Sequence, residues 1–220
     1  MTDNTHAKHV AILGMLAAMA VLSTIFVRIP MMPPPATFLT YDPKDIIVVI
    51  GGFIMGPVAA MMLAGIAAVV EMPFSGTGPW GVVMNFASSA AFAVPAAIIY
   101  KYRRSMAGAI VGLVTGIIIV VPVMLLLNFL IAPLFTGAPR AVIVGMLIPT
   151  FLPFNVIKYS LSAAITLVIY KPIVTALAAA GLLPALTVDN KRKTYVVITI
   201  AAAIIVLGLV VTVIVMNVRA

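Results

Sequence analysis

The stretch AGAIVGLVTGIIIVVPVMLLLNFLI, residues 107–131, carries no charged side chain and is apolar almost throughout. A helix rises about 1.5 Å per residue, so a helix of this length crosses the roughly 30 Å hydrocarbon core of a bilayer. Its apolar residues do not alternate with polar ones, as they would in the strands of a membrane barrel. The stretch therefore predicts a membrane-spanning helix.

The composition of the whole chain indicates the same class. Apolar residues make up 64% of the 220 residues and charged residues 8%, whereas about a quarter of the residues of a soluble domain are charged. A water-soluble fold of this size could not hide so much apolar surface. We therefore expect an all-α integral membrane protein and exclude a soluble enzyme. The other apolar runs are 10–27, 45–56, 57–71, 82–100, 147–170 and 195–216.

The region from 45 to 70 allows either one kinked helix or two short ones. Gly56-Pro57 interrupts it, and proline is common in the first turn of a helix, so we favour two helices that meet there. Basic residues gather at 101–104 and 171–193, and the positive-inside rule predicts that both segments are cytoplasmic. This orientation holds for either interpretation, so the rule does not decide the number of helices.

The segment 28–44 is predicted to be a long loop. It contains Pro30, Pro33, Pro34 and Pro35, and proline at this density prevents a helix and favours extended backbone. Long connections between helices are usually functional. Because this one is also rich in apolar residues, we expect it to cap a pocket at one membrane surface.

Polar residues within the apolar runs are candidates for a binding site. Asn155 and Lys158 are three residues apart and therefore share one helix face. A lysine in hydrocarbon costs about 2.5–3.5 kcal/mol on insertion scales, so such residues are functional by default. Asn128 is expected near the same outer end of its own helix. The alternatives are a lysine that reaches the interface and amides that bond neighbouring helices.

Two acids lie at the start of the 45–56 run. Asp42 and Asp45 are explained most simply as turn and helix-cap residues, and a pair between Asp45 and Lys158 is the alternative. These positions, Asn128 and Asn155 are all expected at the outer face beside the proline-rich loop. They predict an outward-facing pocket for a small molecule with a flat apolar part and hydrogen-bonding edges.

Other functional classes find little support in the sequence. The chain has no cysteine, two histidines and five acidic residues, which excludes a thiol nucleophile and disfavours a metal site. It lacks a phosphate-binding loop, so a transporter of this sequence would need an ATPase from another chain.

We attribute the net charge of +8 to membrane topology rather than to nucleic acid binding. A membrane-embedded lipid enzyme would need clustered acids or histidines in its spans, and a structural subunit would leave Lys158 unexplained.

The first span carries small residues at spacings of three and four: Ala7, Ala11, Gly14 and Ala18. Small residues at this spacing allow close contact between membrane helices. The pattern leaves open whether this face packs inside the protein or docks on a partner membrane protein.

Several segments resemble the substrate-binding (S) components of energy-coupling factor (ECF) vitamin transporters, most of all the riboflavin-specific branch. They are LTYDPKD at 39–45, IGGFIMGP at 50–57, MNF at 84–86, PFNVIK at 153–158 and YKP at 170–172, and the likeness covers about residues 8–173. Lys44 is a departure, because the family often has serine there.

The resemblance implies a bundle of six helices with both ends in the cytoplasm, which supports two helices in 45–70. It implies that the first loop closes over the vitamin at the extracellular side and that Phe38, Leu39 and Thr40 contact it. Asn128, Asn155 and Lys158 match family positions that hydrogen-bond riboflavin. FMN and other vitamins are the alternative ligands.

The family likeness also implies partners. The small residues Ala7, Ala11, Gly14 and Ala18 would dock on a transmembrane coupling (T) subunit that two ATPase subunits drive. The protein would be a riboflavin carrier in a prokaryotic plasma membrane, with no catalysis or cofactor of its own and with a cytoplasmic N-terminus.

The expected domain organisation has three parts. Residues 1–173 form the six-helix substrate-binding membrane domain, and 174–194 form a linker with the basic cluster Lys191-Arg192-Lys193. Residues 195–220 add one C-terminal transmembrane helix beyond the six-helix pattern.

Overall fold

The computed structural model describes residues 3–32, 36, 38–75, 77–180, 200 and 203–204. Its elements are α1 (Asp3–Phe26), β1 (Ile29–Pro30), β2 (Thr40–Tyr41), α2 (Lys44–Met55), α3 (Pro57–Ser75), α4 (Gly78–Tyr102), α5 (Met106–Thr136), α6 (Arg140–Met146), the π-helical turn η1 (Leu147–Phe151) and α7 (Leu152–Ala179).

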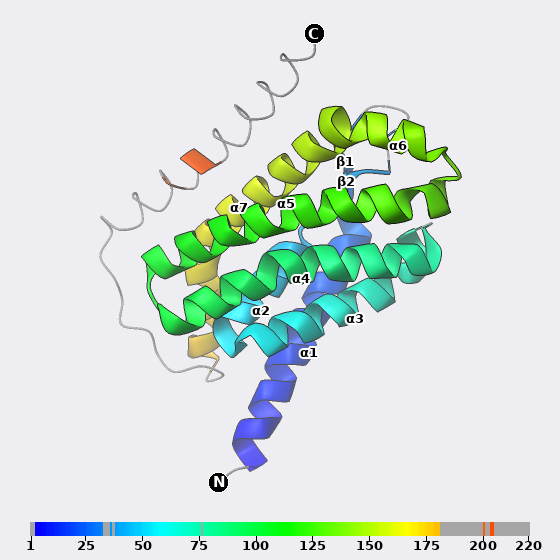
Figure 1. Cartoon of the computed structure of the whole chain (residues 1–220). Coiled ribbons are helices and arrows are strands. Elements are labelled where there is room, and N and C mark those ends of the chain that lie inside the picture. Colours follow the sequence, from blue (N-terminus) through cyan, green and yellow to red (C-terminus); the bar gives the residue numbers. More distant parts are fainter. Residues whose placement is uncertain are drawn as a thin grey trace.

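These helices form a membrane bundle in which α4 lies between α3 and α5 (Figure 1). Five helical segments are long and apolar enough to cross a membrane: Ala7–Phe26, Pro57–Ser75, Gly78–Tyr102, Met106–Thr136 and Arg140–Ala179. The prediction of a helical integral membrane protein is therefore confirmed. Helix α2 has 12 residues, and at about 1.5 Å per residue it is too short to cross alone.

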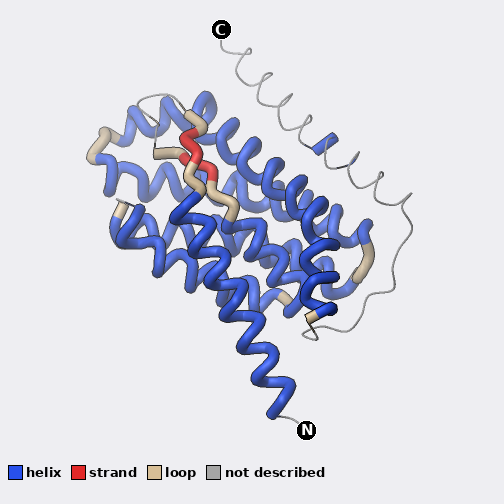
Figure 2. Tube along the Cα trace, turned by 180° about the vertical axis from the view of Figure 1, so that it is seen from behind, coloured by secondary structure: helices blue, strands red, loops and turns tan. Residues whose placement is uncertain are grey.

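The bundle has two distinct ends (Figures 1 and 2). At one end, which we call the basic end, α4 connects to α5 through residues 103–105 and α7 finishes. At the other, which we call the loop end, lie the two strands and the connections from α3 to α4 and from α5 to α6. The basic segment 101–104 thus lies at the opposite end from the long first loop.

The region from 45 to 70 is two helices, as predicted. Gly56 separates α2 from α3 with φ of +97°, a conformation that glycine adopts without steric cost. Pro57 then opens α3, where its missing amide hydrogen removes no helical bond. The break lets a short buried helix be followed by a helix of spanning length.

The last helical run is longer than expected at both ends. It begins at Arg140 and passes through α6 and the π-helical turn η1 into α7, which continues past Pro172 to Ala179. Alanine-rich sequence after Pro172 favours continued helix. The expected linker 174–194 therefore starts inside α7. Its remainder and the expected helix 195–220 lie outside the described residues, apart from positions 200, 203 and 204.

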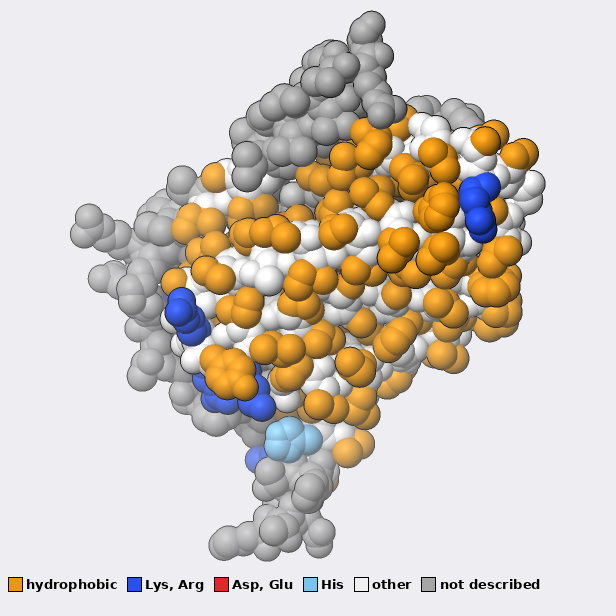
Figure 3. All heavy atoms as spheres, viewed as in Figure 1, with side chains coloured by type: hydrophobic (Ala, Val, Ile, Leu, Met, Phe, Trp, Pro, Cys, Tyr) orange, Lys and Arg blue, Asp and Glu red, His pale blue; other side chains and the backbone are white. Residues whose placement is uncertain are grey.

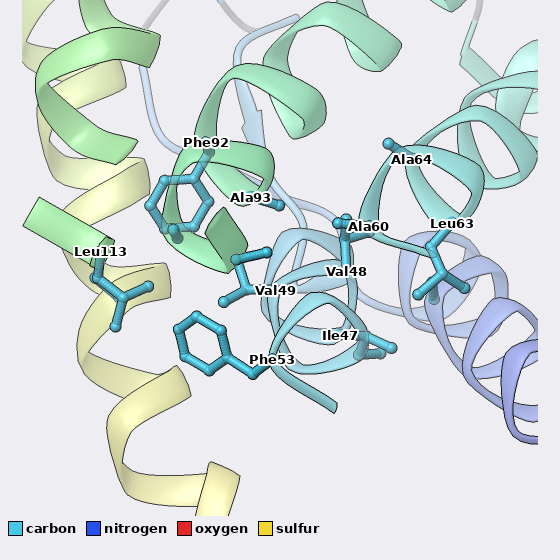
Figure 4. Close-up of a cluster of buried hydrophobic side chains, with 14 of the residues drawn as sticks. Ile47, Val48, Val49, Phe53, Ala60, Leu63, Ala64, Phe92, Ala93 and Leu113 are labelled. Carbon is cyan, nitrogen blue, oxygen red and sulfur yellow. The ribbon is translucent and has the colours of Figure 1, made fainter. Parts of the chain in front are cut away.

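Helix α2 is the centre of the hydrophobic core (Figure 4). Every residue from Lys44 to Phe53 is buried, as expected for a helix surrounded by others. The cluster around it joins Ile47, Val48, Val49 and Phe53 of α2 with Ala60 and Leu63 of α3, Phe92 and Ala93 of α4, and Leu113 of α5.

The outside of the bundle is apolar, which is the reverse of a soluble protein. Apolar side chains spread over the face that α3, α4 and α5 present, and basic side chains lie near its edges (Figure 3). Val58, Ile118 and Leu126 are among the most exposed, at 71%, 66% and 58%. An apolar surface of this extent belongs against lipid.

Helices α4 and α5 approach closely because glycine lies at their contact. A Cβ atom on Gly116 would meet the carbonyl oxygen of Phe92 at 2.4 Å, and one on Gly112 would meet that of Ala96 at 2.8 Å. Small residues allow such backbone contact in membranes, where packing replaces the hydrophobic effect as the main force between helices.

We predict that Gly116→Ala lowers stability by about 1–3 kcal/mol, because the added methyl group forces the two helices apart. Thermal unfolding in detergent measures the change. Gly145→Ala is the matched control, because a Cβ there has no neighbour within 4 Å. An equal loss of stability in both variants would contradict the close contact between α4 and α5.

Candidate functional site

A cavity of about 220 Å³ is lined by residues from the loop end of the bundle. The first loop, the end of α3, the first half of α4, the second half of α5 and the start of α7 contribute its walls. All six residues that the sequence predicted for a ligand site line it: Phe38, Leu39, Thr40, Asn128, Asn155 and Lys158. The structure thus brings them together, and their contact with a ligand stays a prediction.

The first loop covers the cavity because short strands fold it back on itself. Ile29 pairs with Tyr41 and Pro30 with Thr40 in an antiparallel ladder. Leu39 is buried in a cluster with Ala132 of α5 and Phe154 of α7. The described part of the loop therefore lies against the helices, as expected of a cap.

Aromatic rings fix the tip of this loop. The ring of Phe38 lies 5.9 Å from that of Phe135 in an edge-on arrangement and 6.3 Å from that of Phe151. Contacts of this geometry add about 0.5–1.5 kcal/mol each beyond burial. Phe38 is still 37% exposed, so part of its ring remains available at the cavity mouth.

The two asparagines present their amides in the same way. Nδ2 of Asn128 donates to the carbonyl of Met124 and Nδ2 of Asn155 donates to that of Phe151, both at 2.7 Å. Oδ1 of Asn128 is buried without a hydrogen-bond partner in the described part of the chain. An unpartnered buried acceptor is costly, so it suits a hydrogen-bond donor of a ligand.

A π-helical turn precedes Asn155 and Lys158. Pro149 and Pro153 lack the amide hydrogen that a regular helix uses, and residues 147–151 widen into η1. Such turns are frequent at functional sites. Here the turn leads directly into the part of α7 that faces the cavity.

A buried network of ion pairs closes one side of the cavity. Nζ of Lys158 lies 3.2 Å from Oδ2 of Asp42 and 3.5 Å from Oδ2 of Asp45. The predicted alternative of an Asp45–Lys158 pair is therefore confirmed. Oδ1 of Asp45 also accepts a hydrogen bond from Ser89 of α4.

The network continues to α3 and to Arg28, which follows α1. Nζ of Lys44 lies 3.3 Å from Oδ1 of Asp42 and 2.8 Å from Oε2 of Glu71. The other oxygen of Glu71 accepts from Nη2 of Arg28 at 2.7 Å. Three cations and three carboxylates thus neutralise one another.

The comparisons with known proteins identify the family. Residues 8–170 match the family model described as the ECF transporter substrate-specific component.

The chain belongs to this family of S components.

Curated relatives and a solved structure agree with that assignment. The chain is 30% identical over 171 residues to a riboflavin transporter, RibU, of Staphylococcus aureus strain TCH60, covering 74% of this chain and 89% of the relative. It is 29% identical over 167 residues to a riboflavin transporter, FmnP, of Bacillus subtilis strain 168, covering 69% and 84%. A solved structure of the S component of a bacterial ECF transporter matches with a TM-score of 0.67 and 28% identity, covering 78% of this chain and 98% of that one.

The small residues of α1 form one exposed face of this S component. Ala7, Ala11, Gly14 and Ala18 are all exposed. Ile12, Leu16 and Ala20, on the opposite side of the helix, are at most 2% exposed. The row therefore does not pack against the described helices, and its docking on a partner stays a prediction.

Sequence reasoning missed part of the cavity wall. Arg28 and Glu71 were not candidates, although both line the cavity and belong to the network. Lys44 was noted only as a departure from the family, and its pairing with Glu71 now explains how a lysine is accommodated there. A signal existed, because three of the five acids of the chain lie at positions 42, 45 and 71.

We predict that Lys44→Met lowers stability by about 3–5 kcal/mol, because it leaves Glu71 and Asp42 with less positive charge in a buried site. The double variant Lys44→Met with Glu71→Gln should recover much of this loss. Thermal unfolding in detergent measures both. Lys101→Met, at an exposed position, serves as the control and should change little. A tolerated Lys44→Met would contradict the structural role of the network.

Proposed function

We propose that this S component captures riboflavin in the cavity at the loop end and delivers it inward when an ATP-driven module acts on it. The observation that carries the proposal is the convergence of Asn128, Asn155 and Lys158 on one cavity beneath Phe38. Curated relatives that are riboflavin transporters support it.

The chemistry of the cavity suits this ligand. An isoalloxazine ring system is flat, with carbonyl oxygens and a ring N–H at its edges. Phe38, Leu39 and Phe154 offer apolar contacts, the ammonium of Lys158 donates, and Oδ1 of Asn128 accepts. A mainly apolar cavity with a few placed polar groups is the usual form of a small-molecule site.

Charge distribution supports an orientation for the protein. Lys101, Arg103 and Arg104 lie at the basic end, and basic loops favour the cytoplasm. The N-terminus is then cytoplasmic and the cavity opens outside a prokaryotic plasma membrane. In this scheme α1 to α5 and the run 140–179 are the six helices of the family.

The exposed small residues of α1 give the proposal its partner surface. Ala7, Ala11, Gly14 and Ala18 would contact the transmembrane T subunit, which two ATPase subunits drive. The protein itself performs no catalysis and needs no cofactor, because riboflavin is its cargo.

We predict that protein purified in detergent binds riboflavin and quenches flavin fluorescence. Asn128→Ala and Asn155→Ala should each weaken binding about 10- to 100-fold, because each removes a hydrogen bond to the ligand in a site shielded from water. Lys158→Met should weaken binding at least as much, because it also leaves Asp42 and Asp45 without their buried partner. Fluorescence titration gives the dissociation constants.

Thr115→Val is the matched control for the two asparagine variants. Thr115 is half-buried on α5, away from the cavity, and donates to the carbonyl of Val111, four residues earlier, as the asparagines do in their helices. Its substitution should leave affinity unchanged. Protein that binds no riboflavin at micromolar concentration would refute the proposed ligand.

We predict that Ala11→Trp and Gly14→Trp abolish co-purification with the T subunit and ATPases but preserve riboflavin binding. A bulky side chain prevents the close helix contact that small residues allow. Met19→Trp, also exposed on α1 but to one side of the small-residue row, should keep the complex. If the Ala11→Trp variant still formed the complex, the T subunit would have to dock on another surface of the protein.

A further inference from the structure

The cavity wall carries charge of both signs in balance. Its charged lining residues are Arg28, Asp42, Glu71 and Lys158. Lys44 and Asp45 complete the network behind them and are fully buried. The network as a whole adds no net charge to the site, so it offers a ligand polar contacts without a surplus of positive charge.

Arg28 is the cation that a ligand meets most directly, because 28% of its side chain is exposed. All three of its nitrogens already donate hydrogen bonds. Nε donates to the carbonyl of Thr24 at 3.1 Å, Nη1 to that of Phe74 at 2.9 Å, and Nη2 to Glu71 at 2.7 Å. The guanidinium is therefore held against protein acceptors, with its charge neutralised by Glu71.

The helix start beside the cavity offers an anion fewer amide hydrogens than a helix start without proline. Helix α4 begins at Gly78, and a helix N-terminus attracts anions through its free amide hydrogens. Pro79 has no such hydrogen, and the amide of Gly81 donates to the carbonyl of Thr77. Thr77 and Gly81 both line the cavity.

We propose that this cavity selects the uncharged flavin over its 5′-phosphate and that Glu71 sets this preference. The inference rests on the proposed function and specifies its substrate class. A phosphate monoester carries a charge of about −1.5 to −2 at neutral pH. Inside the cavity it meets the carboxylates of Asp42 and Glu71, while the nearby cations are already paired. Like charges brought together in a site that excludes water oppose binding strongly.

Glu71 acts through Arg28, so it is a positioning residue. While the carboxylate is present, it holds the guanidinium and cancels its charge. Removing the negative charge leaves Arg28 as an unbalanced cation at the cavity wall, which favours the phosphorylated ligand. The ratio of affinities for two ligands reports this effect, and a general loss of structure would weaken both ligands alike.

The experiment compares riboflavin and FMN binding to the same detergent-purified protein by fluorescence titration. The wild-type protein should bind riboflavin about 100-fold or more tightly than FMN. Glu71→Gln should reduce that ratio about tenfold, and Glu71→Asp, which keeps the charge, should preserve it. Arg28→Gln changes the charge in the other direction and should increase the ratio.

The double variant Arg28→Gln with Glu71→Gln restores neutrality and should return the ratio towards the wild-type value. Arg28→Gln also carries the test if Glu71→Gln does not fold. Equal affinity of the wild-type protein for both flavins would overturn the inference and leave the proposed function intact. If the ratio of riboflavin affinity to FMN affinity were unchanged in both Glu71→Gln and Arg28→Gln, Glu71 would not set the preference. Binding of neither flavin would instead refute the proposed function.

Discussion

The structure depends on the buried pairing of Lys158 with Asp42 and Asp45. Charges removed from water are costly unless they are paired and hydrogen-bonded. This lysine, on α7, therefore fixes the position of the first loop through Asp42 and the start of α2 through Asp45. The same contact places the ammonium at the cavity wall. One interaction thus holds both a cavity-lining lysine and the described end of the first loop.

The rest of the network extends this constraint to the remaining walls. Lys44 and Glu71 connect α2 with α3, and Arg28 ties the end of α1 to the same carboxylate. The apolar packing of α2 supports these contacts from below, because its side chains are surrounded by α3, α4 and α5 (Figure 4). The cavity therefore lies on a closely packed base.

The sequence predicted what depends on local spacing. Long apolar runs indicated the spans, Gly56-Pro57 indicated the break between α2 and α3, and the spacing of Asn155 and Lys158 placed both on one face. The sequence alone did not predict contacts between segments that are distant along the chain. Arg28 and Glu71 are 43 residues apart, and nothing local in either sequence indicates that they meet. The extension of α7 to Ala179 was missed because Pro172 suggested a helix end, although proline is tolerated in membrane helices.

An experimental structure of the riboflavin complex, determined in lipid or detergent, tests the central claim most directly. The measurement is the distance from the bound flavin to the side chains of Asn155 and Lys158. We expect a flavin in the cavity at the loop end, within hydrogen-bond distance of both residues, with Asp42 still paired to Lys158. A flavin bound elsewhere, or a Lys158 that contacts neither flavin nor Asp42, would contradict it.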